Sequence, residues 1–248
     1  MSIFSFQSLF KKLKTFFYTY QCKKTGFLYQ FVYCQRVYLR TKHEFLSKKE
    51  LDYLCKNIYY KHYMPKNNDL VVCIGAGLGH EAIWIKSIAP NVKYIGVEIQ
   101  PFVYELLCNT FKENKNFHAF SKALNNKTNK VHISSAFDYT AVNEDNNGYI
   151  EVDTFSWDKF INKYKLKKIH LLQINIEGAE KYLLPMINTY KNIDNIIISS
   201  HDFRADRGHG EHFRTRNFIK TYLESVGYTV KKCGEKSREK DWLFATFK

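Results

Sequence analysis

Short apolar runs alternate with amphipathic stretches from about residue 69 to the end of the chain. Runs of Val, Ile and Leu between polar or glycine-rich segments predict buried strands, and apolar positions three or four apart predict helices. We expect strands at residues 69–74, 92–97, 117–120, 131–134, 149–152, 169–176, 195–200, 228–233 and 242–247. We expect helices at residues 79–86, 102–112, 154–163, 179–189 and 213–226. This alternation predicts an α/β fold, a doubly wound parallel sheet with helices on both faces.

The two ends of the chain differ from this pattern. A charged hairpin at residues 234–241 separates the last two strands, which predicts one antiparallel strand at the C-terminal edge of the sheet. Residues 1–64 are expected to form a helical and partly irregular extension, in which Ser47 precedes Glu50 at the spacing of a capping box. We therefore divide the chain into an N-terminal helical extension, residues 1–64, and one domain, residues 65–248.

The charge is concentrated near the N-terminus. The 248 residues carry a formal charge of +14, and residues 1–66 hold 13 basic and 3 acidic side chains. This excess fits an anionic partner, although a coding bias towards Lys and Asn would produce the same composition. Residues 1–24 mix lysines with Phe and Tyr, so they fit either an amphipathic helix in peripheral contact with a membrane or a helix packed on its own domain. No apolar run is long enough to span a bilayer.

The six cysteines have no metal-ligand spacing and are expected to be free thiols in a reducing compartment. The first residues lack the layout of a signal peptide, because lysines interrupt the apolar run. The expected location is cytoplasmic.

A glycine-rich turn follows the first strand of the domain. Residues 73–79 read Cys-Ile-Gly-Ala-Gly-Leu-Gly, and the third glycine comes one residue too early for a dinucleotide site. Glu98 ends the next strand, where a carboxylate can accept both ribose hydroxyls of an adenosine. A ligand without a pyrophosphate, S-adenosylmethionine, fits this pattern. The expected cofactor contacts are Gly75, Ala76, Gly77, Gly79, Glu81, Glu98, Ile99, Ser121, Lys122, Ala123 and Asn175.

Three segments resemble one known family. They are VVCIGAGLGHEAIWI, YIGVEIQPFVYELLCNT and LLQINIEGAEKYLL, and they are similar to signature blocks of the FkbM-type S-adenosylmethionine-dependent methyltransferases over about residues 65–200. The resemblance implies a Rossmann-like class I methyltransferase sheet and O-methylation of sugars, polysaccharide precursors or secondary metabolites. Gln173 and Asn175 replace the Lys and Asp of the family pattern, and Cys73 replaces an Asp.

Polar residues end the last two parallel strands. By similarity to metal-dependent sugar O-methyltransferases, Asn175, His201 and Asp202 would hold a divalent metal and Glu177 would be the general base. Glu177, His201 and Asp202 are thus the catalytic candidates, and such a donor set suits Fe, Mn or Mg. Two alternatives stay open: in one, His201 and Asp202 only cap a strand and bind a loop, and in the other His201 is a base without metal.

An arginine-rich segment follows at residues 203–216. Arg204, Arg207, Arg214 and Arg216 are the candidates for binding the phosphates of a nucleotide sugar, because guanidinium groups pair bidentately with phosphate.

The leading hypothesis is an O-methyltransferase that acts on a sugar hydroxyl of a nucleotide-linked sugar or of a capsule or lipopolysaccharide precursor. An RNA methyltransferase that uses the basic N-terminal region is the alternative. The chain contains no recognisable RNA-binding module and no Asn/Asp-Pro-Pro-Tyr motif, so nucleic acid is not the expected partner. A non-catalytic membrane-surface protein is a third possibility, but it leaves the glycine turn and Glu98 unexplained. The sequence leaves the oligomeric state open.

Overall fold

The computed structural model describes residues 18–125, 130–134, 149–236 and 239–248. The expected amphipathic helix at the N-terminus lies mostly outside the described residues.

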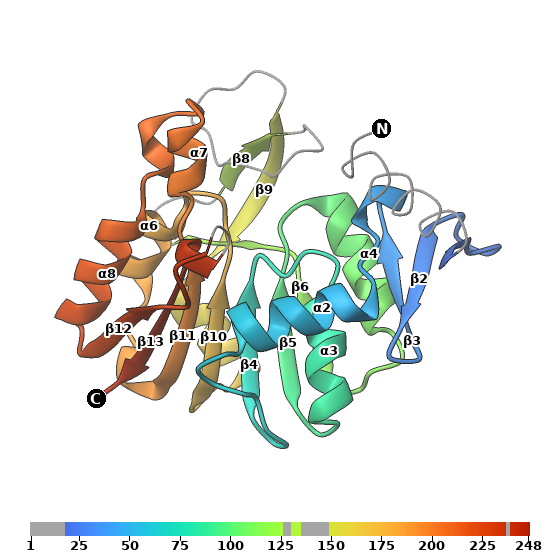
Figure 1. Ribbon diagram of the computed structural model, residues 1–248, viewed down its shortest axis with the longest axis horizontal. Coiled ribbons are helices and arrows are strands. Elements are labelled where there is room, and N and C mark those ends of the chain that lie inside the picture. The colour runs from blue at the N-terminus through green and yellow to red at the C-terminus, as the bar shows by residue number, and fades with distance from the viewer. Residues whose placement is uncertain (1–17, 126–129, 135–148, 237–238) are drawn as a thin grey trace.

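A seven-stranded sheet forms the centre of the molecule, in the order β12-β13-β11-β10-β4-β5-β6 (Figure 1). Its strands are β4 (Leu70–Ile74), β5 (Lys93–Val97), β6 (Phe117–Phe120), β10 (Ile169–Ile174), β11 (Ile193–Ser199), β12 (Tyr228–Lys232) and β13 (Trp242–Phe247). Strand β13 lies between β11 and β12 and is antiparallel to both. The doubly wound α/β fold and the C-terminal antiparallel hairpin predicted from the sequence are confirmed.

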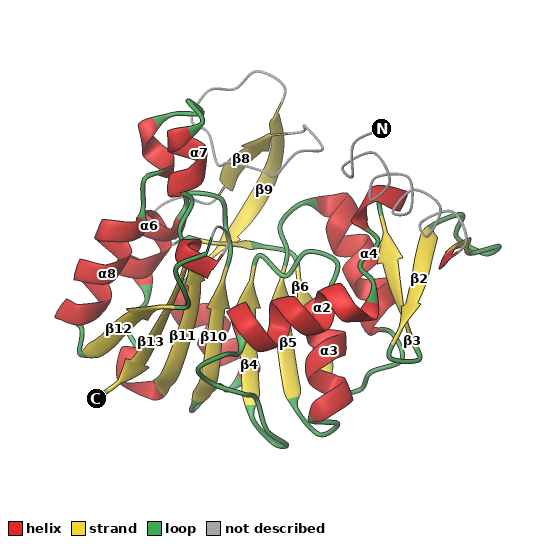
Figure 2. Ribbon diagram, in the orientation of Figure 1, coloured by secondary structure: helices red, strands yellow, loops and turns green. Residues whose placement is uncertain are grey.

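Helices cover both sides of this sheet (Figure 2). The α-helices are α2 (Lys48–Leu54), α3 (His80–Ile88), α4 (Pro101–Phe111), α5 (Trp157–Tyr164), α6 (Glu180–Leu183), α7 (Asp202–Asp206) and α8 (Arg216–Ser225). Shorter helical turns are η1 (Lys42–Glu44), η2 (Cys55–Tyr59), η3 (Leu184–Met186), η4 (Tyr190–Asn192), η5 (Glu211–Phe213) and η6 (Glu239–Asp241). The helix expected at 179–189 is therefore much shorter, because Pro185 allows only a 3₁₀ turn after α6.

Two hydrophobic cores lie on opposite faces of the sheet, because successive strand residues point to opposite sides. Along β4, Val71 and Cys73 enter one core, and Val72 and Ile74 enter the other. The first core also holds residues of α2, α3 and α4, and the second holds residues of α5, α6 and α8. Burial on both faces explains why the strands appear in the sequence as continuous apolar runs.

The N-terminal extension differs from the helical expectation. Residues 19–39 form a three-stranded antiparallel sheet of β1 (Thr19–Gln21), β2 (Leu28–Val32) and β3 (Gln35–Leu39). Helix α2 does begin at the predicted capping box, since the Ser47 side chain accepts from the Glu50 N–H and Glu50 returns the bond. The sheet lies beside α4, at the opposite end of the molecule from α8 and β12 (Figure 1).

A second small sheet carries β7 (Ala123–Leu124), β9 (Tyr149–Phe155) and β8 (Lys130–Ser134), in that order. The two weak strands predicted at 131–134 and 149–152 are confirmed, but β9 continues to Phe155, so that α5 begins at Trp157 instead of residue 154.

Candidate active site

A cavity of about 1700 Å³ lies at the carboxyl ends of β4, β5 and β10. The glycine turn after β4, the beginning of α3 and the segment after β10 line it. In open α/β sheets, ligands bind at this edge, where the strand order changes direction. The volume exceeds the ~300–1,000 Å³ that a single small ligand usually occupies, so the cavity has room for two ligands.

The glycine turn brings backbone close to the cavity. Gly75 has φ +82°, and a Cβ there would lie 2.0 Å from the carbonyl oxygen of Asn175, so any side chain would separate β4 from β10. Gly77 has φ +53° and nothing within 4 Å of its Cβ position, which leaves open space beside the turn. These two glycines are required by conformation and by close approach.

Glu98 joins the end of β5 to this turn. Its Oε2 accepts the Gly77 N–H at 2.9 Å, and its Oε1 accepts the Gln100 N–H at 2.9 Å. Burial raises the pKa of Glu98, while the N–H groups of Gln100 and Gly77 act in the opposite direction. Glu98 lines the cavity, and each of its carboxylate oxygens has a second lone pair, so the group has the capacity to accept two ligand hydroxyls.

Most of the cofactor residues predicted from the sequence line this cavity. They are Gly75, Ala76, Gly77, Glu81, Glu98, Ile99, Ala123 and Asn175. Gly79, Ser121 and Lys122 do not line it, which corrects the expectation. A Cβ on Gly79 would lie 2.8 Å from the Phe111 ring, so this glycine serves helix packing. Lys122 instead pairs with Asp153 at 2.9 Å on the surface.

His80, at the first position of α3, was not among the predicted residues. It lines the cavity, is only 7% exposed, and its Nε2 has no hydrogen-bond partner among the described residues. Burial lowers the pKa of His80 to about 4, so the imidazole is neutral at physiological pH. The signal in the sequence that could have identified His80 is its position directly after the glycine turn.

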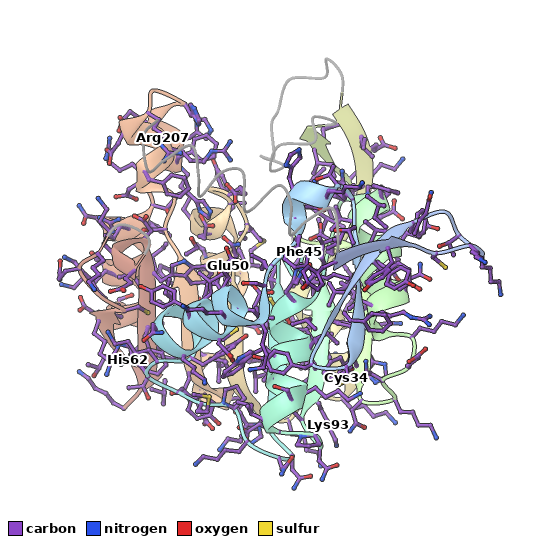
Figure 3. All side chains as sticks on the ribbon, turned by 45° about the vertical axis from the view of Figure 1, so that its right-hand side comes forward. Cys34, Phe45, Glu50, His62, Lys93 and Arg207 are labelled. Carbon is purple, nitrogen blue, oxygen red and sulfur yellow. The ribbon has the colours of Figure 1, made fainter. Side chains whose placement is uncertain are left out.

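The N-terminal extension supplies a wall of the cavity. Residues between the end of β3 and η2 line it, among them Arg40, Phe45, Lys49 and Tyr53. Phe45 and Glu50 are labelled in Figure 3, in the segment that leads into α2 and in α2 itself. The Tyr53 hydroxyl donates to Glu239 at 3.2 Å and so joins this wall to the C-terminal hairpin. No sequence motif marks these residues, because their placement depends on tertiary packing.

A buried ion cluster lies beneath the segment after β10. His201 is 1% exposed, and its Nε2 lies 3.3 Å from Glu177 Oε1. Its Nδ1 lies 3.0 Å from Glu180 Oε1, close enough for an ion pair, although these atoms are not aligned for a hydrogen bond. The second Glu177 oxygen accepts from Arg204 at 2.7 Å. Glu177 belongs both to this cluster and to the lining of the cavity.

The charges in this cluster stabilise one another. Burial opposes the imidazolium form, but Glu177 and Glu180 outweigh it and raise the pKa of His201 to about 9. Burial also opposes ionisation of Glu177, yet His201 and Arg204 lower the pKa of its carboxyl overall. At neutral pH the cluster therefore contains an imidazolium next to a carboxylate. His201, charged and covered, is not a free base.

The Asp202 side chain caps the beginning of a helix. Its Oδ1 accepts the N–H groups of Thr215 and Arg216 at 2.9 and 3.0 Å, and so caps the beginning of α8. Asp202 thus has a structural role, as in one alternative that the sequence left open, but it caps a helix and not a strand.

The residues do not fit the expected metal site. Both His201 nitrogens face carboxylates and Asp202 caps a helix, so these two side chains are not free to bind a metal ion together with Asn175. Within the described ranges, no group of three or more His, Cys, Asp or Glu side chains could hold a metal ion.

The four arginines are also placed differently from the expectation, because none of them lines the cavity. Arg204 binds Glu177 and lies over the Phe213 ring, 4.4 Å from its centroid. Arg207 lies over the Phe203 ring at the end of α7, where Figure 3 labels it. Arg214 pairs with Asp206 and Glu211, and Arg216 pairs with Asp241 at 2.8 Å. A phosphate clamp built from these four side chains is not supported.

The unusual residues of the β4–β10 pair are explained by burial. Gln173 is 2% exposed, and its Oε1 accepts the Tyr60 hydroxyl at 2.8 Å. Cys73 is also buried, and burial raises the pKa of its thiol. A neutral amide and an uncharged thiol avoid the cost of burying an unpaired charge at these positions.

A comparison with protein families decides the assignment. The model of the methyltransferase FkbM domain matches residues 65–230. The chain belongs to the FkbM methyltransferase family. The resemblance read from the three sequence segments is thereby confirmed, and so is methyl transfer that depends on S-adenosylmethionine as the class of reaction. No curated protein matches the chain.

Solved structures resemble this FkbM chain only distantly. The precorrin-6y C5,15-methyltransferase of Geobacter metallireducens has a TM-score of 0.49 and 12% identity, over 85% of this chain and 93% of that one. The Methanococcus jannaschii fibrillarin pre-rRNA processing protein has a TM-score of 0.49 and 14% identity, over 91% and 90%. Aeropyrum pernix fibrillarin, solved with bound S-adenosyl-L-methionine, has a TM-score of 0.45 and 14% identity, over 76% and 71%.

The cavity of this FkbM protein fits the methyl donor of its family. The open side of Gly77 leaves room for a ligand against the backbone, and the neighbouring Glu98 carboxylate could accept ribose hydroxyls. The unpartnered Nε2 of His80 and the beginning of α3 can bind the polar methionine part. These are features of this chain's own residues and do not depend on the distant structures.

Proposed function

We propose that this FkbM protein transfers a methyl group to a sugar hydroxyl, in a nucleotide-linked sugar or in a precursor of a capsule or lipopolysaccharide. S-adenosylmethionine, when bound, supplies an electrophilic sulfonium methyl group. The observation that carries the proposal is that Glu98 and Glu177 line the same cavity from the ends of different strands. One carboxylate is suited to the donor's ribose and the other to a hydroxyl of the acceptor.

Glu177 is suited to accept the acceptor's proton. Its carboxylate is ionised at neutral pH, because His201 and Arg204 lower its pKa. A carboxylate with a low pKa is too weak a base to deprotonate a free sugar hydroxyl. Once the hydroxyl oxygen gains a methyl group, however, its O–H becomes far more acidic than a carboxylic acid. Glu177 can therefore orient the hydroxyl by a hydrogen bond and take its proton as the C–O bond forms.

Two aromatic side chains and three lysines in the cavity lining support a sugar acceptor. Tyr53 and Tyr182, 49% and 60% exposed, both line the cavity, and aromatic rings are suited to stacking on a pyranose. Lys49, Lys181 and Lys236 line it as well and provide cations for an anionic sugar or a phosphate. These lysines replace the arginine segment as the candidate contacts for a negatively charged acceptor.

A two-step assay tests the proposal. Titration calorimetry with S-adenosylmethionine first establishes that the donor binds. Turnover is then measured with a panel of nucleotide sugars and, separately, with total RNA. Methylation of a nucleotide sugar that is lost in Glu177→Gln supports the proposal. Methylation of RNA alone contradicts it and supports the alternative.

A further inference from the structure

The sheet β1–β3 has two faces of different character. Val32, Val37 and Leu39 are buried against the body of the molecule, as expected for the inner face. The outer face of such a sheet is usually polar. Here Tyr20, Tyr29 and Phe31 lie on that face, with Tyr20 opposite Tyr29 in the register. Tyr20 and Phe31 are 45% and 51% exposed, whereas Tyr29 is half-buried and also packs against the first core.

These three rings form one continuous aromatic patch. The ring centroids of Tyr20 and Tyr29 are 5.6 Å apart, as are those of Tyr29 and Phe31, and those of Tyr20 and Phe31 are 6.0 Å apart. The Arg36 guanidinium lies over the patch, 5.4 Å from the Tyr29 centroid and 5.9 Å from that of Phe31. Exposed apolar patches bordered by polar groups mark interaction sites.

The segment that forms the patch contains more basic than acidic residues. Residues 18–44 contain Lys23, Lys24, Arg36, Arg40 and Lys42 and one acid, Glu44, which pairs with Arg40. Residues 1–17 add three lysines and no acid. Lys23 and Lys24 are exposed in the turn between β1 and β2. Glu113, after α4, faces Arg36 across a small surface hollow. Lys23, Lys24 and Arg36 therefore favour a negatively charged partner at this face.

We propose that this outer face binds the surface of an anionic lipid bilayer. Tyr and Phe rings partition into the boundary between headgroups and acyl chains, and lysine and arginine side chains around them bind anionic headgroups. Single-stranded RNA would need separate ring faces on which bases stack, whereas these rings pack against one another. No described helix is long and apolar enough to cross a membrane, so the contact is peripheral.

The patch is also continuous with the wall of the cavity. Strand β3 leads directly into Arg40, His43 and Phe45, which line the cavity. Binding of the sheet to a bilayer would therefore hold that wall next to the membrane surface. This inference does not depend on the identity of the acceptor.

Vesicle sedimentation with the full chain tests the proposal. Vesicles of phosphatidylcholine with phosphatidylglycerol are compared with vesicles of phosphatidylcholine alone. We expect the protein to sediment with the anionic vesicles and not with the neutral ones, and the bound fraction to fall as salt rises. Failure to sediment with anionic vesicles at low salt overturns the proposal.

Two variants locate the surface. The double variant Tyr20→Ser, Phe31→Ser and the triple variant Lys23→Gln, Lys24→Gln, Arg36→Gln should each bind anionic vesicles at least tenfold more weakly. The matched control is Phe218→Ser, Lys220→Gln on α8, at the opposite end of the molecule, which should bind like the wild type. Unchanged binding of the aromatic variant overturns the proposal, because another surface would then hold the vesicle.

Two further measurements check the folding of the variants and the binding of RNA. Calorimetry with S-adenosylmethionine should give the same affinity in all three variants as in the wild type, which shows that they fold. If the wild type shifts total RNA in a gel but does not bind vesicles, the face is a nucleic-acid site and the proposal is wrong.

Discussion

Glu177 and His201 come from the carboxyl ends of neighbouring strands, and Glu177 Oε1 lies 3.3 Å from His201 Nε2. The carboxylate belongs to the cavity lining, whereas the imidazole is covered. The buried imidazolium thus helps to keep the Glu177 carboxylate in the cavity ionised. The stability of the protein tests the role of His201, and its turnover tests the role of Glu177.

The stability of the protein should decrease at alkaline pH because of His201. Its pKa rises from the ordinary 6.5 to about 9, so its contribution is complete below 6.5 and is lost as pH increases through 9. The raised pKa corresponds to roughly 3 kcal/mol at most. Urea unfolding of the wild type and His201→Gln at pH 6 and pH 9.5 measures this.

The informative quantity in that experiment is the difference in the free energy of unfolding between the wild type and His201→Gln. It should shrink by roughly 3 kcal/mol or less from pH 6 to pH 9.5, because only the wild type loses an imidazolium. An equal difference at both pH values would show that His201 is not charged in the folded protein.

Glu177→Gln should abolish most of the turnover and preserve donor binding. The amide has the same shape but cannot accept the proton from the alkylated oxygen, and loss of a general base typically costs ~10²–10⁴-fold in rate. The measurements are kcat with a nucleotide sugar that the wild type methylates and the Kd of S-adenosylmethionine by calorimetry. A variant with wild-type kcat would remove Glu177 from the reaction.

Asp202→Ala should destabilise the protein without removing activity at permissive temperature. Asp202 accepts two N–H groups at the beginning of α8, and loss of such a cap costs ~0.5–2 kcal/mol. The control is Asp206→Ala, which removes a largely exposed partner of Arg214 and should cost much less. Thermal unfolding compares the two, and an equal loss of stability would contradict the capping role.

Chelation should leave both donor binding and turnover unchanged. The side chains of His201 and Asp202 are engaged with carboxylates and with backbone N–H groups, so they are not available as ligands. Activity is measured before and after exhaustive treatment with a chelator, together with elemental analysis. Loss of turnover that manganese or iron restores would contradict this arrangement of the site.

The sequence was sufficient for the central domain and insufficient for the extension. Burial on both faces made each central strand visible as an apolar run, and the Ser47–Glu50 spacing located the beginning of α2. The β2–β3 hairpin was missed because its two turn residues, Tyr33 and Cys34, both have positive φ, at 49° and 59°. Such a turn is usually signalled by Asn-Gly, and neither of those residue types occurs at these two positions.

The candidate site shows the same limit. Strand order brought Glu98, Asn175 and Glu177 to one cavity, since all three follow directly from the ends of sheet strands. Strand order could not predict where the side chains of His201 and Asp202, after β11, would point. The Asp202 side chain accepts N–H groups at the beginning of α8. The His201 side chain is buried next to Glu180, a buried carboxylate at the beginning of α6.

The central claim is that Glu98 holds the methyl donor in the cavity next to the glycine turn. Titration calorimetry with S-adenosylmethionine on the wild type, Glu98→Ala and the exposed control Glu105→Ala tests it most directly. We expect wild-type affinity in Glu105→Ala and a loss of roughly tenfold or more in Glu98→Ala, since hydrogen bonds to a charged group contribute ~1.5–3 kcal/mol each. Unchanged affinity in a folded Glu98→Ala variant, or no binding to the wild type, would contradict the account.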